Sequence, residues 1–120
     1  MMRAIMLAGI LAIGVAATAS AAGIAGWYKV EGTNADGSPY RGVAEIVATG
    51  GSTCRIRWDT GSISTGICMR SGDAFSAAYQ LGDKIGLVIY EIQDDGSMRG
   101  TWTIADSPGV GTEMLTPQKQ

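Results

Sequence analysis

Residue types that usually carry chemistry are few in this 120-residue chain, and they do not form a catalytic set. The sequence contains no histidine. This removes the commonest general base and metal ligand, and it excludes mechanisms that pair Ser or Cys with His. Asp94 and Asp95 are adjacent in a turn-forming stretch, whereas the two carboxyl groups of a glycosidase come from separate elements beside a cleft. We therefore predict no enzymatic activity, no catalytic residues and no cofactor.

One loop has the spacing of a calcium site. Asn34, Asp36 and Ser38 are placed as at the start of such a loop, and Glu45 falls at its twelfth position. However, the first position is Asn instead of Asp, and residues 40–45 have the character of a strand instead of a helix start. We therefore interpret this stretch as a turn between strands and predict no metal site.

The amino terminus has the order of a signal peptide. A short positive start is followed by the uncharged apolar run 4–17 and then by the small residues 18–23. The run is too short and too rich in Ala and Gly for a membrane-spanning helix, which needs about 20 apolar residues. We expect a helical signal peptide over 1–22, with cleavage after residue 19, 21 or 22, one domain over 23–116 and a flexible tail over 117–120. The mature protein is expected in the periplasm or outside the cell, without a membrane span.

Two cysteines, Cys54 and Cys68, suggest a disulfide in an exported chain. If residues 60–62 form a three-residue loop, these cysteines lie opposite each other on adjacent strands and a bridge is geometrically plausible. A two-residue turn would instead pair Cys54 with Ile67, which makes the more apolar face and points Cys68 the other way. A bulge would reconcile the two registers. The oxidising compartment favours the disulfide.

The remaining pattern is that of an all-β chain. Eighteen glycines are too many for helices but suit tight turns and close strand approaches. Turn signals recur at the spacing of a sandwich or barrel. The predicted strands are 26–31, 40–49, 53–59, 63–69, 74–80, 84–92, 98–105 and 110–115. Short connections favour an eight-stranded antiparallel up-and-down barrel, since closure removes exposed edges; an open sandwich is the alternative.

Large aromatic and arginine side chains are the candidate binding residues, because Trp, Tyr and Arg concentrate binding energy at interfaces. They are Trp27, Tyr40, Arg41, Arg55, Arg57, Trp58 and Trp102. Core packing of the aromatics and ordinary solubility of the arginines are the alternative interpretations. The net charge of -2, with scattered basic residues, argues against a nucleic-acid partner.

An ordered set of short motifs covers nearly all of the mature chain. The set comprises 26–34 (GWYKVEGTN), 36–42 (DGSPYRG), Trp58, Gly66, 72–73 (GD), 88–90 (VIY), 95–97 (DGS), 100–102 (GTW) and 111–117 (GTEMLTP). It resembles a family of small exported proteobacterial proteins labelled fibronectin-binding proteins. The recurring Gly-x-Trp/Tyr pattern also resembles avidin-like barrels of the calycin type, although no biotin-binding shell can be placed. Where the family labelled fibronectin-binding is expected to have Gly-x-Gly, this chain has 66–68 (GIC), and this departure leaves the role of the cysteines open.

Three functions are compatible with these features. The resemblance implies a non-enzymatic module that binds fibronectin or another extracellular or periplasmic protein. A barrel of this size can also hold one small ligand in a cavity. An inhibitor of a periplasmic protease or lysozyme is the third possibility, although the short loops offer no protruding segment to enter an active site. Inward glycines such as Gly86 and Gly100 either leave a cavity or allow close packing.

Overall fold

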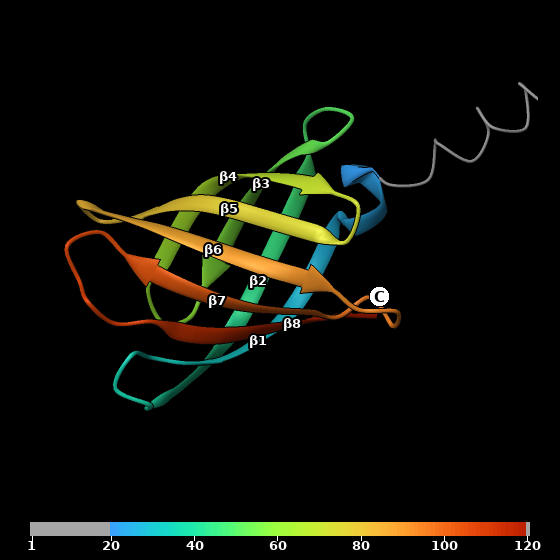
Figure 1. The fold of residues 1–120 in the computed structure, drawn as a ribbon. Helices are drawn as coiled ribbons and strands as arrows, with labels where there is room; N and C mark the ends of the chain where they lie inside the picture. The colour runs from blue at the N-terminus through green and yellow to red at the C-terminus, as the bar shows by residue number, and fades with distance from the viewer. Residues whose placement is uncertain (1–19, 120) are drawn as a thin grey trace, which may run out of the picture.

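A computed structural model describes residues 20–119 as one closed antiparallel barrel in which every strand pairs with its neighbours in the chain (Figure 1). The 3-10 helix η1 (Ala21–Ile24) precedes eight strands. These are β1 (Gly26–Thr33), β2 (Pro39–Ala48), β3 (Thr53–Asp59), β4 (Ile63–Ser71), β5 (Ala74–Leu81), β6 (Lys84–Ile92), β7 (Met98–Ile104) and β8 (Gly111–Pro117). The predicted fold class and all eight strands are confirmed, with no boundary shifted by more than two residues.

Inward-pointing side chains fill the barrel, and they alternate along each strand with side chains that point outward. In β3, Cys54, Ile56 and Trp58 are buried while Arg55 and Arg57 are exposed, because successive residues of a strand point to opposite faces of the sheet. The same period of two operates in the other strands. The largest fully buried side chains are Tyr90, Phe75, Ile46, Ile56, Met98, Leu115, Val30 and Val88. The barrel interior is therefore packed over most of its length.

The β3–β4 hairpin has the three-residue loop, and the alternative register with a two-residue turn is wrong. Asp59 pairs with Ile63, which places Cys54 directly opposite Cys68. Their Cα atoms are 4.9 Å apart and their sulfur atoms are bonded, so the predicted disulfide is confirmed. The cost of this register is that Ile67 faces outward and is 71% exposed. Three inward positions of β4 hold the small residues Ser64, Gly66 and Cys68, which leaves room inside for the bulky side chains of β3.

One end of the barrel is closed by the segment before β1. Ala21 and Ile24 are buried there, and the Tyr28 hydroxyl donates to the Ile24 carbonyl at 2.7 Å. The Arg70 guanidinium donates to the Ser20 carbonyl at 3.0 Å. Figure 1 shows η1 lying beside the β2–β3 turn at this end. Most of the predicted signal peptide lies outside the described residues, and β8 continues two residues beyond the predicted end of its strand.

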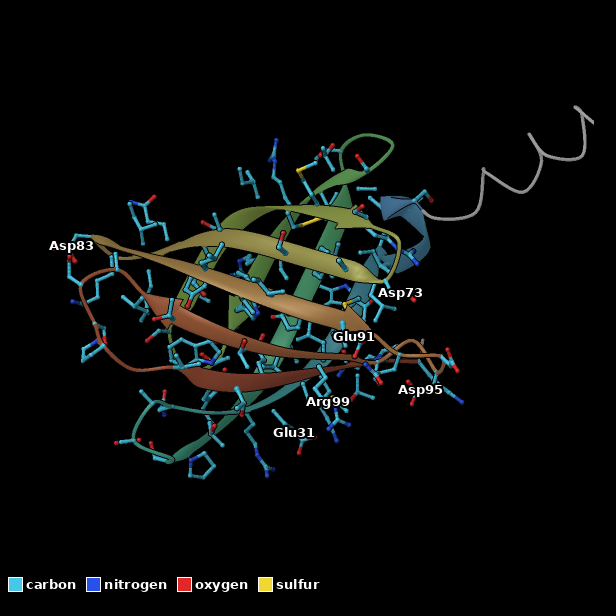
Figure 2. The ribbon with its side chains drawn as sticks, viewed as in Figure 1. Glu31, Asp73, Asp83, Glu91, Asp95 and Arg99 are labelled. Carbon is cyan, nitrogen blue, oxygen red and sulfur yellow. A yellow bond between two sulfur atoms is a disulfide. The ribbon has the colours of Figure 1, made fainter. Side chains whose placement is uncertain are left out.

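The opposite end, here called the mouth, is surrounded by four connections: β1–β2, β3–β4, β5–β6 and β7–β8. Figure 2 shows Asp83 at the tip of one of them, far from Asp73 and Asp95 at the closed end. Within the described part of the chain, no helix has the length and apolar character needed to cross a membrane.

Candidate functional site

Aromatic rings at the mouth lie on glycines of neighbouring strands. Tyr40 pairs with Gly32, and Tyr79 pairs with Gly86. In each pair a Cβ on the glycine would collide with the ring. Glycine therefore lets each ring lie against the neighbouring backbone. Of the two alternatives for Gly86, a cavity or close packing, the structure shows close packing. The pairs Tyr90 with Gly100 and Trp102 with Gly111 repeat the arrangement.

Above these rings is a pocket of about 290 Å³ that opens at the mouth. Four aromatic side chains line it as two edge-to-face pairs. Tyr40 and Trp102 have ring centroids 6.2 Å apart, and Trp58 and Tyr79 have centroids 5.2 Å apart. The other lining residues are Asn34, Thr60, Ser62, Ser64, Leu81, Val88, Ile104 and Glu113. This volume lies just below the lower end of the range of roughly 300–1,000 Å³ that ligand pockets span.

The carboxylate of Glu113 lies at the floor of the pocket and receives three hydrogen bonds. The Tyr40 hydroxyl donates to Oε1 at 2.7 Å. Trp58 Nε1 donates to Oε2 at 2.9 Å, and the buried Tyr90 hydroxyl also donates to Oε2. Glu113 is only 7% exposed. Its three donors come from β2, β3 and β6, so the carboxylate ties together strands from several sides of the barrel.

This burial sets the ionisation of the site. Desolvation raises the pKa of the Glu113 carboxyl, although the hydrogen bonds from Tyr90, Tyr40 and Trp58 oppose the shift. Burial and the nearby Glu113 carboxylate raise the pKa of Tyr79 to about 12. The same two causes raise the pKa values of Tyr40 and Tyr90 still further. The phenols are therefore neutral donors at ordinary pH. Among these four groups, Glu113 is the one that gains a proton as pH is lowered.

The seven candidate binding residues fall into two groups. Three of them, Tyr40, Trp58 and Trp102, meet in the mouth pocket. The other four side chains lie outside it: Trp27, Arg41, Arg55 and Arg57 are exposed on the outer faces of β1, β2 and β3. The geometry therefore brings together part of the predicted set and leaves the arginines dispersed around the barrel wall.

Sequence reasoning missed two residues of the site, Tyr79 and Glu113. A signal for Glu113 was present, since it lies two residues before Leu115 in β8 and therefore on the same inward face. An acidic residue on an apolar face is a polar group that needs partners. Tyr79 is one of the large aromatic residues of the chain, but its place at the mouth depends on the β5–β6 register.

The turn at residues 34–39 is confirmed as a strand connection. The Asp36 carboxylate accepts hydrogen bonds from the backbone N–H and hydroxyl of Ser38, at 2.9 and 2.6 Å. These bonds lower the pKa of Asp36. Asp95 and Ser97 repeat the arrangement at the closed end. Within residues 20–119, no group of three or more His, Cys, Asp or Glu side chains is placed to hold a metal ion.

The outer wall over β4, β5 and β6 is apolar. Ile67 and Met69 project from β4, and Leu87 and Ile89 project from β6. Between them β5 presents the small residues 74, 76 and 78. A shallow groove lined by some of these residues therefore runs along the outside of the barrel. Exposed apolar surface of this kind is a feature of interaction sites.

No protein-family model matches this sequence, and no curated protein matches it either. Solved structures do match in fold. A redesigned beta barrel, b11L5F_LGL, has a TM-score of 0.73 at 17% identity, covering 83% of this chain and 96% of that one. The redesigned beta barrel mFAP1, bound to DFHBI, has a TM-score of 0.71 at 18% identity, covering 82% and 99%. The REP1-NXSQ fatty acid transporter has a TM-score of 0.52 at 16% identity, covering 82% and 98%.

These comparisons concern the fold and not the ligand. None of them supports the fibronectin-binding resemblance. At such low identities, the likeness extends to the architecture alone. The chain is a closed eight-stranded antiparallel up-and-down β-barrel, and it shares this fold with the redesigned beta barrels.

Proposed function

We propose that this protein is a non-enzymatic carrier or sensor that binds one small molecule in the mouth pocket. The observation that carries the proposal is the pocket itself: four aromatic side chains and a few polar groups converge on it at the open end of a barrel whose remaining interior is packed. Concave sites with apolar walls and a few oriented polar groups are the usual form of ligand sites. Two of the structural neighbours, mFAP1 with DFHBI and the fatty acid transporter, are described as binding or carrying small molecules.

The chemistry of the pocket favours binding over catalysis. Glu113 is its one carboxylate, and its hydrogen-bond partners are two phenols and an indole, whose protons stay in place at ordinary pH. No nucleophile in the pocket is paired with a base that could activate it. A bound molecule would therefore be held and oriented without being transformed.

The test is a titration with N-phenyl-1-naphthylamine, an uncharged dye that fluoresces in apolar sites. Ser64 lines the pocket from β4, so Ser64→Trp should fill it and abolish saturable binding. The matched control is Ser76→Trp, which places the same side chain on the outer groove of β5. Equal affinity of the two variants, or loss only in Ser76→Trp, would rule out the mouth as the binding site.

A second candidate function, binding of a protein, is favoured by the apolar outer wall of β4–β6 and was the expectation from the family resemblance. Ile67 and Ile85 are 71% and 62% exposed there. Immobilised fibronectin is the first partner to test. Saturable binding that is lost in Ile67→Lys and retained in Ser64→Trp would support this function, and its absence would leave only the mouth pocket.

A further inference from the structure

We propose that the ligand of the mouth pocket is a small organic cation, such as a quaternary ammonium or a protonated alkylamine. This inference rests on the proposed function and names the chemical class that the same site selects. It is carried by the position of the Glu113 carboxylate at the floor of a pocket walled by aromatic rings.

The charge of the pocket is the first argument. Glu113 is a carboxylate, and the lining residues include no Lys or Arg. Within the described residues, Arg70 contacts the Ser20 carbonyl at the closed end, while Arg41, Arg55 and Arg57 are exposed on the outer wall. The buried carboxylate therefore has neutral hydrogen-bond donors but no cation beside it. A cationic ligand would supply the missing counter-charge, whereas a ligand carboxylate would meet a like charge.

The second argument is that the Glu113 carboxylate can accept further hydrogen bonds. An ionised carboxylate offers about four lone-pair sites. Oε2 accepts from both Trp58 and Tyr90, but Oε1 accepts only from Tyr40. Because Glu113 lines the pocket, Oε1 retains an acceptor site for a ligand N–H or for the positive surface of a methylated ammonium.

The third argument is the wall. Tyr40, Trp58, Tyr79 and Trp102 surround the space as two edge-to-face pairs. Aromatic faces carry negative electrostatic potential and attract cations, with Trp the strongest, and rings grouped into a cage recognise quaternary ammonium groups. An uncharged apolar ligand would gain contact with these rings but would leave the negative charge of the Glu113 carboxylate without a counter-charge.

The rim of the mouth adds a weaker contribution. Three of the four connections there carry an aspartate, Asp36, Asp83 or Asp106, and the fourth directly follows Asp59, the last residue of β3. Figure 2 shows Asp83 at the outermost tip. Acidic rims raise the local concentration of cations. The closed end also carries aspartates, so the rim favours approach while the pocket provides the selectivity.

The test compares three molecules of the same shape and different charge: choline, uncharged 3,3-dimethylbutan-1-ol and anionic 3,3-dimethylbutanoate. Binding is followed by tryptophan fluorescence in a Trp27→Phe background, because Trp27 is the one tryptophan outside the pocket. We expect choline to bind at least about tenfold more tightly than the alcohol, a ratio within the range of cation–aromatic attraction, and the anion to bind most weakly.

Glu113→Gln separates charge from shape. The amide can still accept from Trp58 and Tyr90, and the Tyr40 hydroxyl can turn to the Thr112 carbonyl, 3.3 Å away. The choline-to-alcohol ratio should fall to about one in this variant. A pH titration of the unmodified pocket gives the same information without a substitution at Glu113. Tyr40, Tyr79 and Tyr90 face Glu113 and stay protonated, so choline affinity should fall as pH is lowered through the Glu113 titration while alcohol affinity stays constant.

The outcomes distinguish the two proposals. If the alcohol binds as tightly as choline, or if the ratio survives both Glu113→Gln and acidification, the cation assignment is wrong while small-molecule binding stands. If neither these molecules nor the naphthylamine dye binds at the mouth, both proposals fail.

Discussion

Replacement of Glu113 by leucine tests whether the buried carboxylate is the acceptor that holds the mouth together. Leucine is similar in size but cannot accept the bonds from Trp58 and Tyr90, both of which are buried. The Tyr40 hydroxyl has the Thr112 carbonyl as an alternative acceptor. Two buried donors are therefore left without partners.

The magnitude follows from the cost of an unsatisfied buried group. Each such donor costs about 1–3 kcal/mol, so Glu113→Leu should lower the free energy of unfolding by about 2–6 kcal/mol. Adding Tyr90→Phe removes one of the two stranded donors. The double variant should therefore be more stable than Glu113→Leu alone by about 1–3 kcal/mol, although it lacks one more polar group.

Urea unfolding followed by far-UV circular dichroism provides the measurement, with Tyr90→Phe alone completing the double-mutant cycle. Tyr90→Phe alone should be destabilising, because it withdraws a bond to a charged acceptor. The reasoning is refuted if the double variant is no more stable than Glu113→Leu, or if the effects of the two substitutions simply add.

Three further predictions concern ionisation, covalent linkage and packing. Because burial raises the pKa of the Glu113 carboxyl in the folded state, the stability of the wild type relative to Glu113→Gln should be greatest below the ordinary carboxyl pKa of about 4.3 and should fall as pH rises through the folded value; parallel stability curves from urea unfolding across pH would contradict this. Replacing Cys54 and Cys68 together by alanine opens a loop with a sequence separation of 14 and should cost about 3 kcal/mol in thermal or urea unfolding; an unchanged midpoint would show that the bond does not constrain the chain. Gly86→Ala should displace the tyrosine ring packed on it and weaken dye binding at the mouth, whereas Gly51→Ala, where a Cβ meets open space, should not; equal dye affinities would mean that the ring is not positioned by the glycine.

The fold could be predicted from the sequence because each local signal pointed the same way. In β3, alternation of Cys54, Ile56 and Trp58 with arginines defined both faces, and turn-forming residues set the ends of the strands. The β3–β4 register was the exception. Hydrophobic pattern favoured burying Ile67, while the cysteines required it to face outward. The hydrophobic pattern describes each strand by itself, whereas the disulfide depends on how two strands pair.

The site could be predicted only in part, because it is assembled from residues distant in the chain. Tyr40 and Trp58 lie 73 and 55 residues from Glu113 in sequence, and Tyr90 lies 23 residues away. Aromatic character marked the first two as candidates for binding. What brings them to one carboxylate is the closure of β8 onto β1, which no local pattern contains.

At the amino-terminal boundary, the packing of the first described residues distinguishes between cleavage positions that the sequence pattern leaves open. Of the three cleavage positions compatible with a signal peptide, only the one after Ala19 retains Ser20 and Ala21. Ala21 is fully buried, its N–H donates to the Gly51 carbonyl at 3.0 Å, and Arg70 donates to the Ser20 carbonyl.

A chain that begins at Gly23 loses the charged hydrogen bond from Arg70 to the Ser20 carbonyl, the backbone bond from Ala21 to Gly51, two longer backbone bonds around η1, and a buried methyl group. The Arg70 bond, the Gly51 bond and the methyl group together should make this chain less stable than one that begins at Ser20 by about 3–5 kcal/mol. Urea unfolding of the two chains measures the difference, and a Ser20 chain carrying Ala21→Gly is the control that loses the methyl group alone. Once the predicted signal peptide is removed, the intact mass of the protein should correspond to a chain starting at Ser20. A mass that starts at Ala22 or Gly23, or equal stability of the two chains, would mean that the segment before β1 is not part of the barrel's closed end.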